Sequence, residues 1–367
     1  MVLRILSSVL LLISLSFGGT IYVSSSSGDD KGDGTIENPL ASLWRAIEIA
    51  SDGDTIYVAG GKYYGENGSG RWKIQRNIAI IGGVEDKTFK PSKCGQWCNA
   101  TVLYGNNDSL ADSRIPVISI EGTNSVLIRA LIIDGSFRNN YDENGCLVSD
   151  DSASAIISCE TDGDVRIDGC VLFNSGGAGI EVRTEKGTAE ITNCVIFNCV
   201  GAGISLYAEK SSARFAINDN QILLTWKKGT GGFGLNVDSP GEIEIGFNYI
   251  AYSQSPAINV ARWNENVSLR YNKFLSNRGG EYRFVNESGG KELLKAKDVC
   301  TRKIFDNCEG NEYKQPKITV PAIAARGARA GCIAPKMKIE ITPMKIKFDI
   351  ENEKFFQNIR RRRMRHR

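Results

Sequence analysis

The chain has 367 residues, of which 41% are hydrophobic, and a formal net charge of +3. Six arginines fall within residues 360–367, so the rest of the chain sums to −3. This composition predicts a folded protein with a sizeable core and excludes an extended basic surface of the kind that follows a nucleic-acid backbone. We interpret the arginine-rich end as a solvated tail; the alternative is a patch that binds an anionic polymer.

The first 18 residues have the pattern of a secretory signal peptide. Arg4 precedes an apolar run over 5–17 that is too short to span a bilayer, and Gly18 follows at a plausible cleavage point. A retained N-terminal anchor is the alternative. The expected location is therefore secreted, periplasmic or at the cell surface, with the cell envelope as a candidate partner.

The next segment predicts a strand over 20–24, a helix, and a second strand over 55–59. Ser42 is expected to cap the helix. Its apolar residues recur at i, i+3, i+4 and i+7, at Leu43, Ala46, Ile47 and Ala50. Such a helix is suited to cover the open end of a sheet, which would otherwise be an unpaired edge.

Between residues 153 and 275 two short phrases alternate at intervals of about 24 residues. The first carries an aliphatic residue, at Ile156, Ile180, Ile204, Leu235 and Ile258. The second carries Cys or Asn, at Cys170, Cys194, Asn220, Asn248 and Asn272. Two short strands recurring at this period predict the stacked coils of a parallel solenoid, because each coil can bury its apolar face only against its neighbours.

The run IYVSSSSGDD…GT…NPLASLWRAIEIASDGDTIYVAGGKY, followed by IAIIGGVEDKTF, resembles the opening of parallel β-helix proteins of the pectin lyase-like superfamily. The resemblance covers residues 20 to about 290. It implies an all-β fold, a right-handed parallel β-helix (solenoid) with an N-terminal capping helix and a small C-terminal region. It also implies that the Cys and Asn positions form a stacked ladder at a tight bend, where side-chain amides satisfy buried backbone groups.

These patterns divide the chain into four expected parts: a signal peptide (1–18), a β-helix domain (19–290), a C-terminal capping region (291–359) and a basic tail (360–367). Within the third part, residues 337–350 alternate like a strand pair.

Ten cysteines in an exported protein predict disulfide bonds. Three pairs are close enough in sequence to close small loops, with the connectivity left open: Cys94/Cys98, Cys300/Cys308 and Cys146/Cys159. As neighbouring rungs, Cys170 and Cys194 are expected to be either two buried thiols or a disulfide. Zinc is disfavoured, because the only histidine is His366.

Two interruptions of the repeat predict loops that leave the same corner of the solenoid. The step from a ladder position to the next aliphatic residue takes 10 residues in the regular coils, but 25 from Leu131 to Ile156 and 15 from Asn220 to Leu235. The loops are three coils apart, roughly 14 Å at about 4.8 Å per coil. With short glycine-rich connectors between them, they predict a groove for an extended polymer.

The two loops supply the candidate site residues. In the downstream loop, Trp226 could stack on a sugar ring, and Lys227 and Lys228 could meet a uronate carboxylate. In the upstream loop, Arg138 and Tyr141 are candidates for substrate binding, and four carboxylates are candidate ligands for Ca²⁺, the one cofactor considered: Asp142, Glu143, Asp150 and Asp151. The alternative is that all of these are solvated loop residues.

The sequence favours an exported or cell-surface protein that binds polysaccharide, with acidic glycans among the candidates, or that serves as an envelope or adhesive component. The alternative is a Ca²⁺-assisted polysaccharide lyase acting by β-elimination on an acidic glycan. Such a lyase needs a cation that neutralises the uronate and a base that removes its C5 proton, for which the candidates are Lys227, Lys228, Arg183 and Arg262. Residues 272–290 resemble the segment of alginate lyase and chondroitinase B-like enzymes that supplies a catalytic lysine, but Glu287 stands where that lysine is expected. A structural surface element is the third reading. No nucleic-acid partner is expected, and neither catalysis nor the oligomeric state follows from the sequence.

Overall fold

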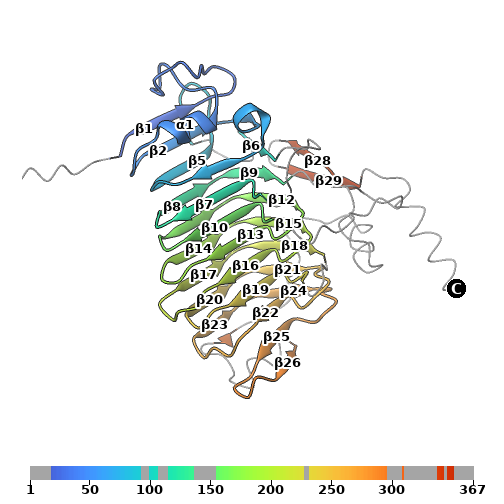
Figure 1. Cartoon of the computed structure of the whole chain (residues 1–367). Helices are drawn as coiled ribbons and strands as arrows, with labels where there is room; N and C mark the ends of the chain where they lie inside the picture. The colour runs from blue at the N-terminus through green and yellow to red at the C-terminus, as the bar shows by residue number, and fades with distance from the viewer. Residues whose placement is uncertain are drawn as a thin grey trace, which may run out of the picture.

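The computed structural model describes residues 18–91, 99–105, 115–135, 154–226 and 231–295, and the backbone of three short strands beyond them. In this part of the chain, short strands are stacked in successive coils (Figure 1). The described residues contain one α-helix, α1 (Leu43–Ile49), and one 3-10 turn, η1 (Glu66–Gly68). None of the described helices is long and apolar enough to cross a membrane.

A complete coil contributes one strand to each of three sheets, and single strands extend the sheets at the ends of the stack. Sheet A contains β1 (Thr20–Val23), β2 (Thr55–Ala59), β5 (Ile78–Val84), β8 (Val126–Arg129), β11 (Val165–Asp168), β14 (Thr188–Thr192), β17 (Arg214–Asn218), β20 (Glu242–Gly246), β23 (Val267–Arg270) and β27 (Cys308–Glu309). Sheet B contains β3 (Gly61–Tyr63), β6 (Thr101–Tyr104), β9 (Leu131–Asp134), β12 (Val171–Ser175), β15 (Val195–Cys199), β18 (Gln221–Thr225), β21 (Tyr249–Ala251) and β24 (Lys273–Leu275). Sheet C contains β4 (Trp72–Ile74), β7 (Ile118–Gly122), β10 (Ile157–Thr161), β13 (Ile180–Arg183), β16 (Ile204–Tyr207), β19 (Leu235–Asp238), β22 (Ile258–Val260), β25 (Tyr282–Val285) and β26 (Lys291–Leu294).

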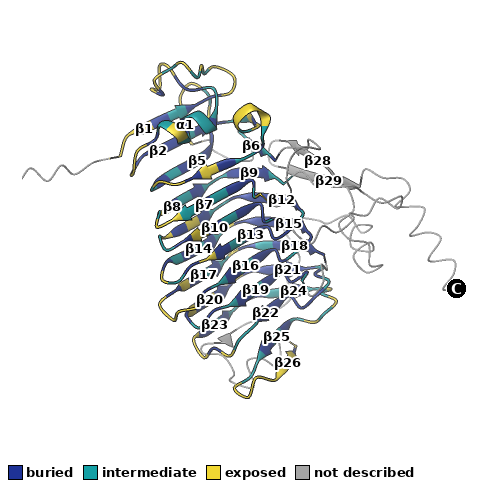
Figure 2. Ribbon diagram, viewed as in Figure 1, coloured by how far each residue is buried: buried dark blue, intermediate teal, exposed yellow. Residues whose placement is uncertain are grey.

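Strand pairing within these sheets is parallel, except that β26 returns antiparallel to β25. The predicted parallel β-helix is therefore confirmed. The aliphatic positions of the repeat are in register, so that Ile180 pairs with Ile204, Ile204 with Leu235, and Leu235 with Ile258. All four side chains are fully buried in one core that runs through the centre of the coils, which Figure 2 shows as dark blue stretches along the strands.

The Asn ladder stands at the bend between sheets A and B. Asn220, Asn248 and Asn272 are buried, and each accepts a hydrogen bond from the backbone N–H of the preceding rung at 2.9–3.1 Å. The Nδ2 atom of Asn248 donates to the carbonyl of Ile217 at 2.8 Å. The residue before each of these rungs has positive φ, as at Asp219 (59°), which makes the bend tight enough to require these partners. The predicted structural ladder is therefore confirmed.

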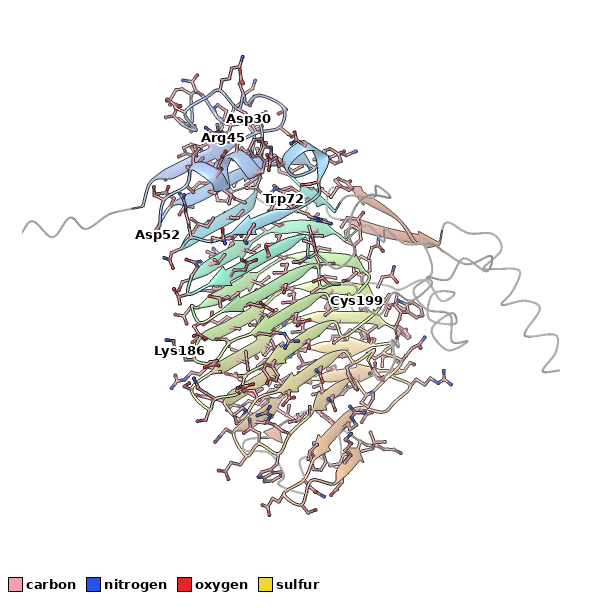
Figure 3. The ribbon with its side chains drawn as sticks, in the orientation of Figure 1. Asp30, Arg45, Asp52, Trp72, Lys186 and Cys199 are labelled. Carbon is pink, nitrogen blue, oxygen red and sulfur yellow. The ribbon has the colours of Figure 1, made fainter. Side chains whose placement is uncertain are left out.

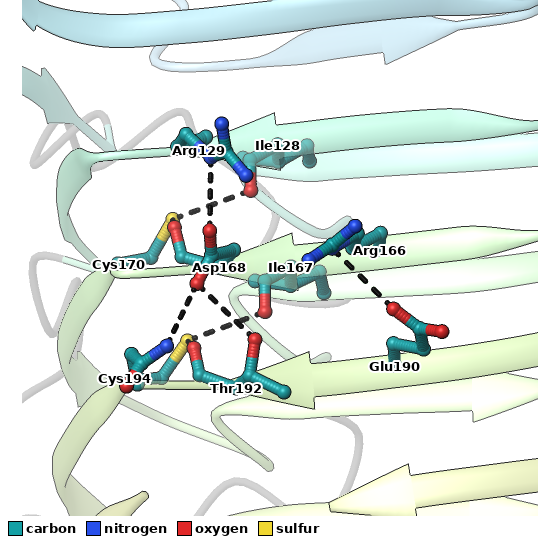
Figure 4. Close-up of polar contacts among 10 residues, drawn as sticks. Ile128, Arg129, Arg166, Ile167, Asp168, Cys170, Glu190, Thr192 and Cys194 are labelled. Atoms are coloured by element: carbon teal, nitrogen blue, oxygen red, sulfur yellow. Dashed lines mark hydrogen bonds and ion pairs between the residues drawn. The ribbon is translucent and has the colours of Figure 1, made fainter. Parts of the chain in front are cut away.

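In the earlier coils the ladder continues with sulfur in place of amide groups (Figure 4). The thiol of Cys170 donates to the carbonyl of Ile128 at 3.7 Å, and that of Cys194 to the carbonyl of Ile167 at 3.6 Å. Both cysteines are free, so the thiol alternative holds for this pair. Beside them Asp168 binds Arg129 at 2.9 Å. Burial raises the pKa of this carboxyl, but its hydrogen bonds and the guanidinium outweigh burial and lower it.

The helix α1 contacts β1, β2 and β4 and buries Leu43 and Ala46. It begins after Ser42, as expected, but the serine hydroxyl does not cap it. That hydroxyl donates instead to the Asp30 carboxylate at 2.8 Å. Asp30 also accepts the backbone N–H of Ser42 and so fixes the residue that precedes the helix.

Beyond the coils, β28 (Met337–Thr342) pairs antiparallel with β29 (Lys345–Ile350), as the alternation over 337–350 predicts. Among the predicted disulfides, the pair Cys146/Cys159 is wrong. Cys159 occupies an inward position of β10 and is a free, fully buried thiol. Cys94, Cys98, Cys146 and Cys300 lie outside the described residues, and of Cys308 only the backbone is described.

Candidate functional site on the outer face of sheet C

Two columns of polar side chains cross the outer face of sheet C, because inward and outward positions alternate along every strand. The first column, in register order, is Lys73, Ser119, Ser158, Glu181, Ser205, Asn236, Asn259 and Arg283. The second column is Glu121, Glu160, Arg183, Tyr207 and Asp238. This face is therefore a regular array of hydrogen-bonding groups repeated at the strand spacing.

Neighbouring rungs of the first column bind one another. The Nδ2 atom of Asn236 donates to Ser205 at 3.3 Å, and that of Asn259 donates to Asn236 at 2.6 Å. Arg283 donates through Nε to Asn259 at 2.6 Å. These contacts fix the orientation of the amides before any ligand arrives.

A cavity of about 820 Å³ lies at the end of this face nearest α1. Its apolar side includes Trp44 and Ile47 of α1, which are only partly buried against the core. Its polar side includes Lys73, Glu121 and Glu160 from β4, β7 and β10. Figure 3 labels Arg45 of α1 and Trp72 of β4 at this end of the stack. An aromatic wall beside polar strand positions is the arrangement that small-molecule and sugar ligands use, with apolar contact for the ring and hydrogen bonds for orientation.

The carboxylate of Glu121 contacts two side chains of the neighbouring segment. It binds the ammonium of Lys73 at 2.7 Å and accepts from Gln75 at 3.4 Å. Glu160 is its register partner on the next coil and is exposed. The two carboxylates therefore stand on adjacent strands about 4.8 Å apart at the backbone, one paired with a cation and both lining the cavity.

A second cavity of about 390 Å³ adjoins the first along the second column and shares Glu160 with it. Tyr207 lines it, and two guanidinium groups lie over the Tyr207 ring, that of Arg183 at 5.3 Å and that of Arg262 at 6.0 Å from the ring centre. The phenol donates to Glu209 at 2.9 Å, and this hydrogen bond raises the pKa of Tyr207. The ring and the two cations hold one another in place through cation–π attraction.

Arg183 and Arg262, two of the predicted catalytic candidates, are thus brought together on this face. Each is already bound to a carboxylate, Arg183 to Glu181 at 2.8 Å and Arg262 to Asp238. A guanidinium group is a poor base in any protein environment, so neither arginine is suited to remove a proton from a substrate. Both remain able to bind an anionic group.

The prediction that Trp226 stacks on a sugar ring is wrong. Its side chain is fully buried, and its Nε1 atom donates to Asn198 at 2.7 Å. Neither face of the ring is open to a ligand. Trp226 directly follows β18, so its side chain packs inside the protein and does not belong to an exposed loop. The two interruptions do leave the corner between sheets B and C, from β9 to β10 and from β18 to β19.

The other predicted site residues lie outside the described residues: Arg138, Tyr141, Asp142, Glu143, Asp150, Asp151, Lys227 and Lys228. The proposed Ca²⁺ ligands are among them. Within the described ranges, no group of three or more His, Cys, Asp or Glu side chains is placed to hold a metal ion.

The residues that sequence reasoning missed are Trp44, Lys73, Glu121 and Glu160. Outward alternation on the strands was a usable signal for the last three, since Lys73 and Glu160 each stand between two buried neighbours and Glu121 follows the buried Ile120. Trp44 falls off the apolar stripe of its helix, and this was the available sign that its ring is not wholly committed to the core.

No protein-family model matches the chain, and no curated protein matches it by sequence. A structure of GH136 lacto-N-biosidase from Eubacterium ramulus matches with a TM-score of 0.51 and 15% identity, covering 74% of this chain and 58% of that one. XylC in complex with xylose matches with a TM-score of 0.47 and 12% identity, covering 72% of this chain and 63% of that one. A rhamnogalacturonan lyase matches with a TM-score of 0.44 and 13% identity, covering 83% of this chain and 90% of that one.

The chain spans about three fifths of the length of the first two of these proteins, 58% and 63%. The lacto-N-biosidase likeness is one of fold alone. It agrees with the sheet topology, which shows that the chain folds as a parallel β-helix.

Proposed function

We propose that this protein binds polysaccharide along the outer face of sheet C, with sugar units held in the cavity between α1 and β4, β7 and β10. The observation that carries the proposal is the pairing of an aromatic wall, Trp44, with polar groups of Lys73 and Glu121 in one cavity of about 820 Å³. Sugar rings have apolar faces and hydroxyl edges, so they need both kinds of contact. The GH136 lacto-N-biosidase, which shares the fold, is named for an activity on sugars and agrees with this proposal.

The length of the polar array favours a polymer over a single sugar. The first column runs from Lys73 to Arg283 across eight strands, and at about 4.8 Å per strand it extends over roughly 34 Å. A chain lying across the coils would meet a polar side chain of the first column at every strand, and one of the second column as well on the five strands from β7 to β19. An acidic glycan would find cations along the same path, at Lys73, Arg183 and Arg283.

We propose further that the protein is exported and acts at the cell surface or envelope, and that α1 caps the first coil. The proposal that α1 is a cap is supported by its contacts with β1, β2 and β4 and by the burial of Leu43 and Ala46, while Trp44 and Ile47 line the cavity. The helix would then serve both as a lid for the core and as one wall of the binding site.

A Ca²⁺-assisted lyase is the alternative function, and the experiment described below distinguishes it from binding alone. Its cation could be Arg183 or Arg262, once a substrate carboxylate replaced Glu181 or Asp238 as the partner. Its base would have to come from another residue, with Lys227 and Lys228 as the sequence candidates.

Affinity electrophoresis tests the proposal. The full chain is run through gels that contain neutral and acidic polysaccharides in turn, with Trp44→Ala and the matched control Trp263→Ala. Trp263 is an exposed tryptophan that does not line this cavity. We expect one glycan to retard the wild-type protein. The retardation should decrease severalfold in Trp44→Ala and stay at the wild-type level in Trp263→Ala. The absence of retardation with every glycan, or equal loss in both variants, would contradict the proposal. Ultraviolet absorbance of unsaturated uronates, appearing when the protein is mixed with an acidic glycan and Ca²⁺, would establish the lyase.

A further inference from the structure

The outer face of sheet B differs from the other two faces. Most of its outward positions from β6 to β18 are apolar and fall in two columns, Val102, Ile132, Val171 and Val195 in one and Phe173, Phe197 and Leu223 in the other. The remaining outward positions of these five strands are Tyr104, Asp134 and Gln221. The strand neighbours of the apolar residues, Leu172, Ile196 and Ile222, belong to the central core, which places these seven on the opposite side of the sheet. The rings of Phe173 and Phe197 stack with centres 5.2 Å apart.

These seven apolar side chains are buried, with exposures of 0–6%. On sheet A, by contrast, the outward residues Arg166 and Glu190 are 52% and 45% exposed. A face of this size and composition that is shielded from water is a second hydrophobic interface, separate from the core inside the coils. Something must cover it.

The strand pair β28–β29 has the complementary chemistry. In its antiparallel register Met337 pairs with Ile350, Ile339 with Phe348, and Ile341 with Ile346. The alternate positions pair Lys338 with Asp349, Glu340 with Lys347, and Thr342 with Lys345. Because strand positions alternate between two faces, the ribbon has one wholly apolar face and one charged face with two pairs of opposite sign.

An isolated two-stranded ribbon is marginally stable in water and needs a hydrophobic surface to pack against. The chain is long enough to bring it to sheet B. From β27, at the far end of sheet A, residues 310–336 span up to about 90 Å when extended, whereas the eight strands of sheet B cover roughly 34 Å. Six residues per strand are about 20 Å long, enough to cross the apolar columns from β9 to β18.

We propose that the β28–β29 ribbon docks with its apolar face on the outer face of sheet B, against Val171, Phe173, Val195, Phe197 and Leu223. The C-terminal region is thereby a clamp that seals one side of the solenoid and leaves the outer face of sheet C open to ligand. This docking is independent of polysaccharide binding.

Photo-crosslinking in the full chain tests the proposal. The photoreactive amino acid p-benzoylphenylalanine replaces Phe197 on the proposed interface or, as the matched control, Tyr207 on the outer face of sheet C. The Phe197 position is expected to form an adduct with a peptide from 337–350 of the same chain, and the control is not. Irradiation of a mixture of isotopically light and heavy protein distinguishes docking within one chain from docking between two copies. Adducts confined to 296–336 or 351–367, light–heavy adducts, or no adduct at all would overturn the proposal.

A second measurement does not depend on the unnatural amino acid. Oxidative labelling of Phe173 and Phe197 is expected to rise severalfold in Phe348→Asp and to stay at the wild-type level in Lys347→Asp, which alters the charged positions of the same strand. Amide exchange of β13 and β16 in both variants verifies that the coils remain folded. Equal labelling in the two variants, with the coils intact, would refute docking through the apolar face.

Discussion

Replacing Asn248 with alanine removes the middle rung of the buried amide ladder. Its Oδ1 atom accepts the backbone N–H and the Nδ2 group of Asn220, each at 3.0 Å. Its Nδ2 atom donates to the carbonyl of Ile217 at 2.8 Å and to Asn272 at 3.0 Å. Alanine leaves the Asn220 N–H and the Ile217 carbonyl buried without these partners.

The expected loss follows from these two backbone groups. Each buried group left unsatisfied costs about 1–3 kcal/mol, so Asn248→Ala should lower the free energy of unfolding by about 2–6 kcal/mol. Asn248→Cys should cost less, because the thiols of Cys170 and Cys194 already donate to the corresponding carbonyls in the earlier coils. A cysteine thiol can donate to the Ile217 carbonyl in place of the amide, but its sulfur is only a weak acceptor for the Asn220 N–H.

Urea denaturation followed by circular dichroism measures these differences in the full chain. Glu244→Ala is the matched control, since Glu244 is exposed on the same coil, and surface changes of this kind usually stay within about 0.5 kcal/mol. Amide exchange at Asn220 locates the effect. If Asn248→Ala unfolds within about 0.5 kcal/mol of the wild type, or if the cysteine variant is the weaker of the two, the account of the ladder is wrong.

Titratable side chains supply two further tests. Burial raises the pKa of Asp86, but hydrogen bonds from the hydroxyls of Ser24, Ser26 and Ser27 at 2.8–2.9 Å outweigh it and hold the pKa below the ordinary 3.8. The stabilisation by the Asp86 carboxylate is fully present above pH 3.8 and is lost as the pH falls through the lower pKa of the folded protein. Between pH 5 and pH 3 the melting temperature of Asp86→Asn should therefore fall less steeply with pH than that of the wild type. Equal slopes in the two proteins would contradict this prediction. The four described thiols are free and buried, so they should resist alkylation in the native protein at about pH 8 and react after denaturation. Burial also raises the pKa values of Cys159, Cys194 and Cys199, that of Cys199 to about 12. Mass spectrometry of the labelled peptides decides this, and rapid native labelling would count against their burial.

The fold was predictable because its periodicity is visible in single residues. Ile180, Ile204 and Leu235 repeat at the length of one coil, and parallel stacking places equal positions in register. The recurring Cys and Asn positions were visible for the same reason, and their role as a ladder followed from the resemblance to parallel β-helix proteins. The placement of individual side chains at the corners was not, since Trp226 could be assigned to a loop from spacing alone, although its burial depends on a partner 28 residues away, Asn198.

The candidate site was only half predictable. Alternation along the strands is sufficient to place Arg183 and Tyr207 on the outer side of sheet C. The cavity, however, combines Trp44 of α1 with Glu121 and Glu160 from later coils, and no local pattern indicates that these segments meet. The irregular spacing of the repeat predicted a binding groove between the loops that join sheets B and C, whereas the described cavities lie over the regular strands of sheet C.

Oxidative footprinting of the full chain, with and without a polysaccharide that it binds, locates the ligand on the protein surface without any substitution. Trp44 and Tyr207 line the two cavities on sheet C, while Phe247 and Tyr271 are exposed at the bend between sheets A and B. If glycan binds along sheet C, it will protect Trp44 and Tyr207 and leave the labelling of Phe247 and Tyr271 unchanged. Protection of Phe247 and Tyr271 with none at Trp44, or no protection by any glycan, would contradict binding along sheet C.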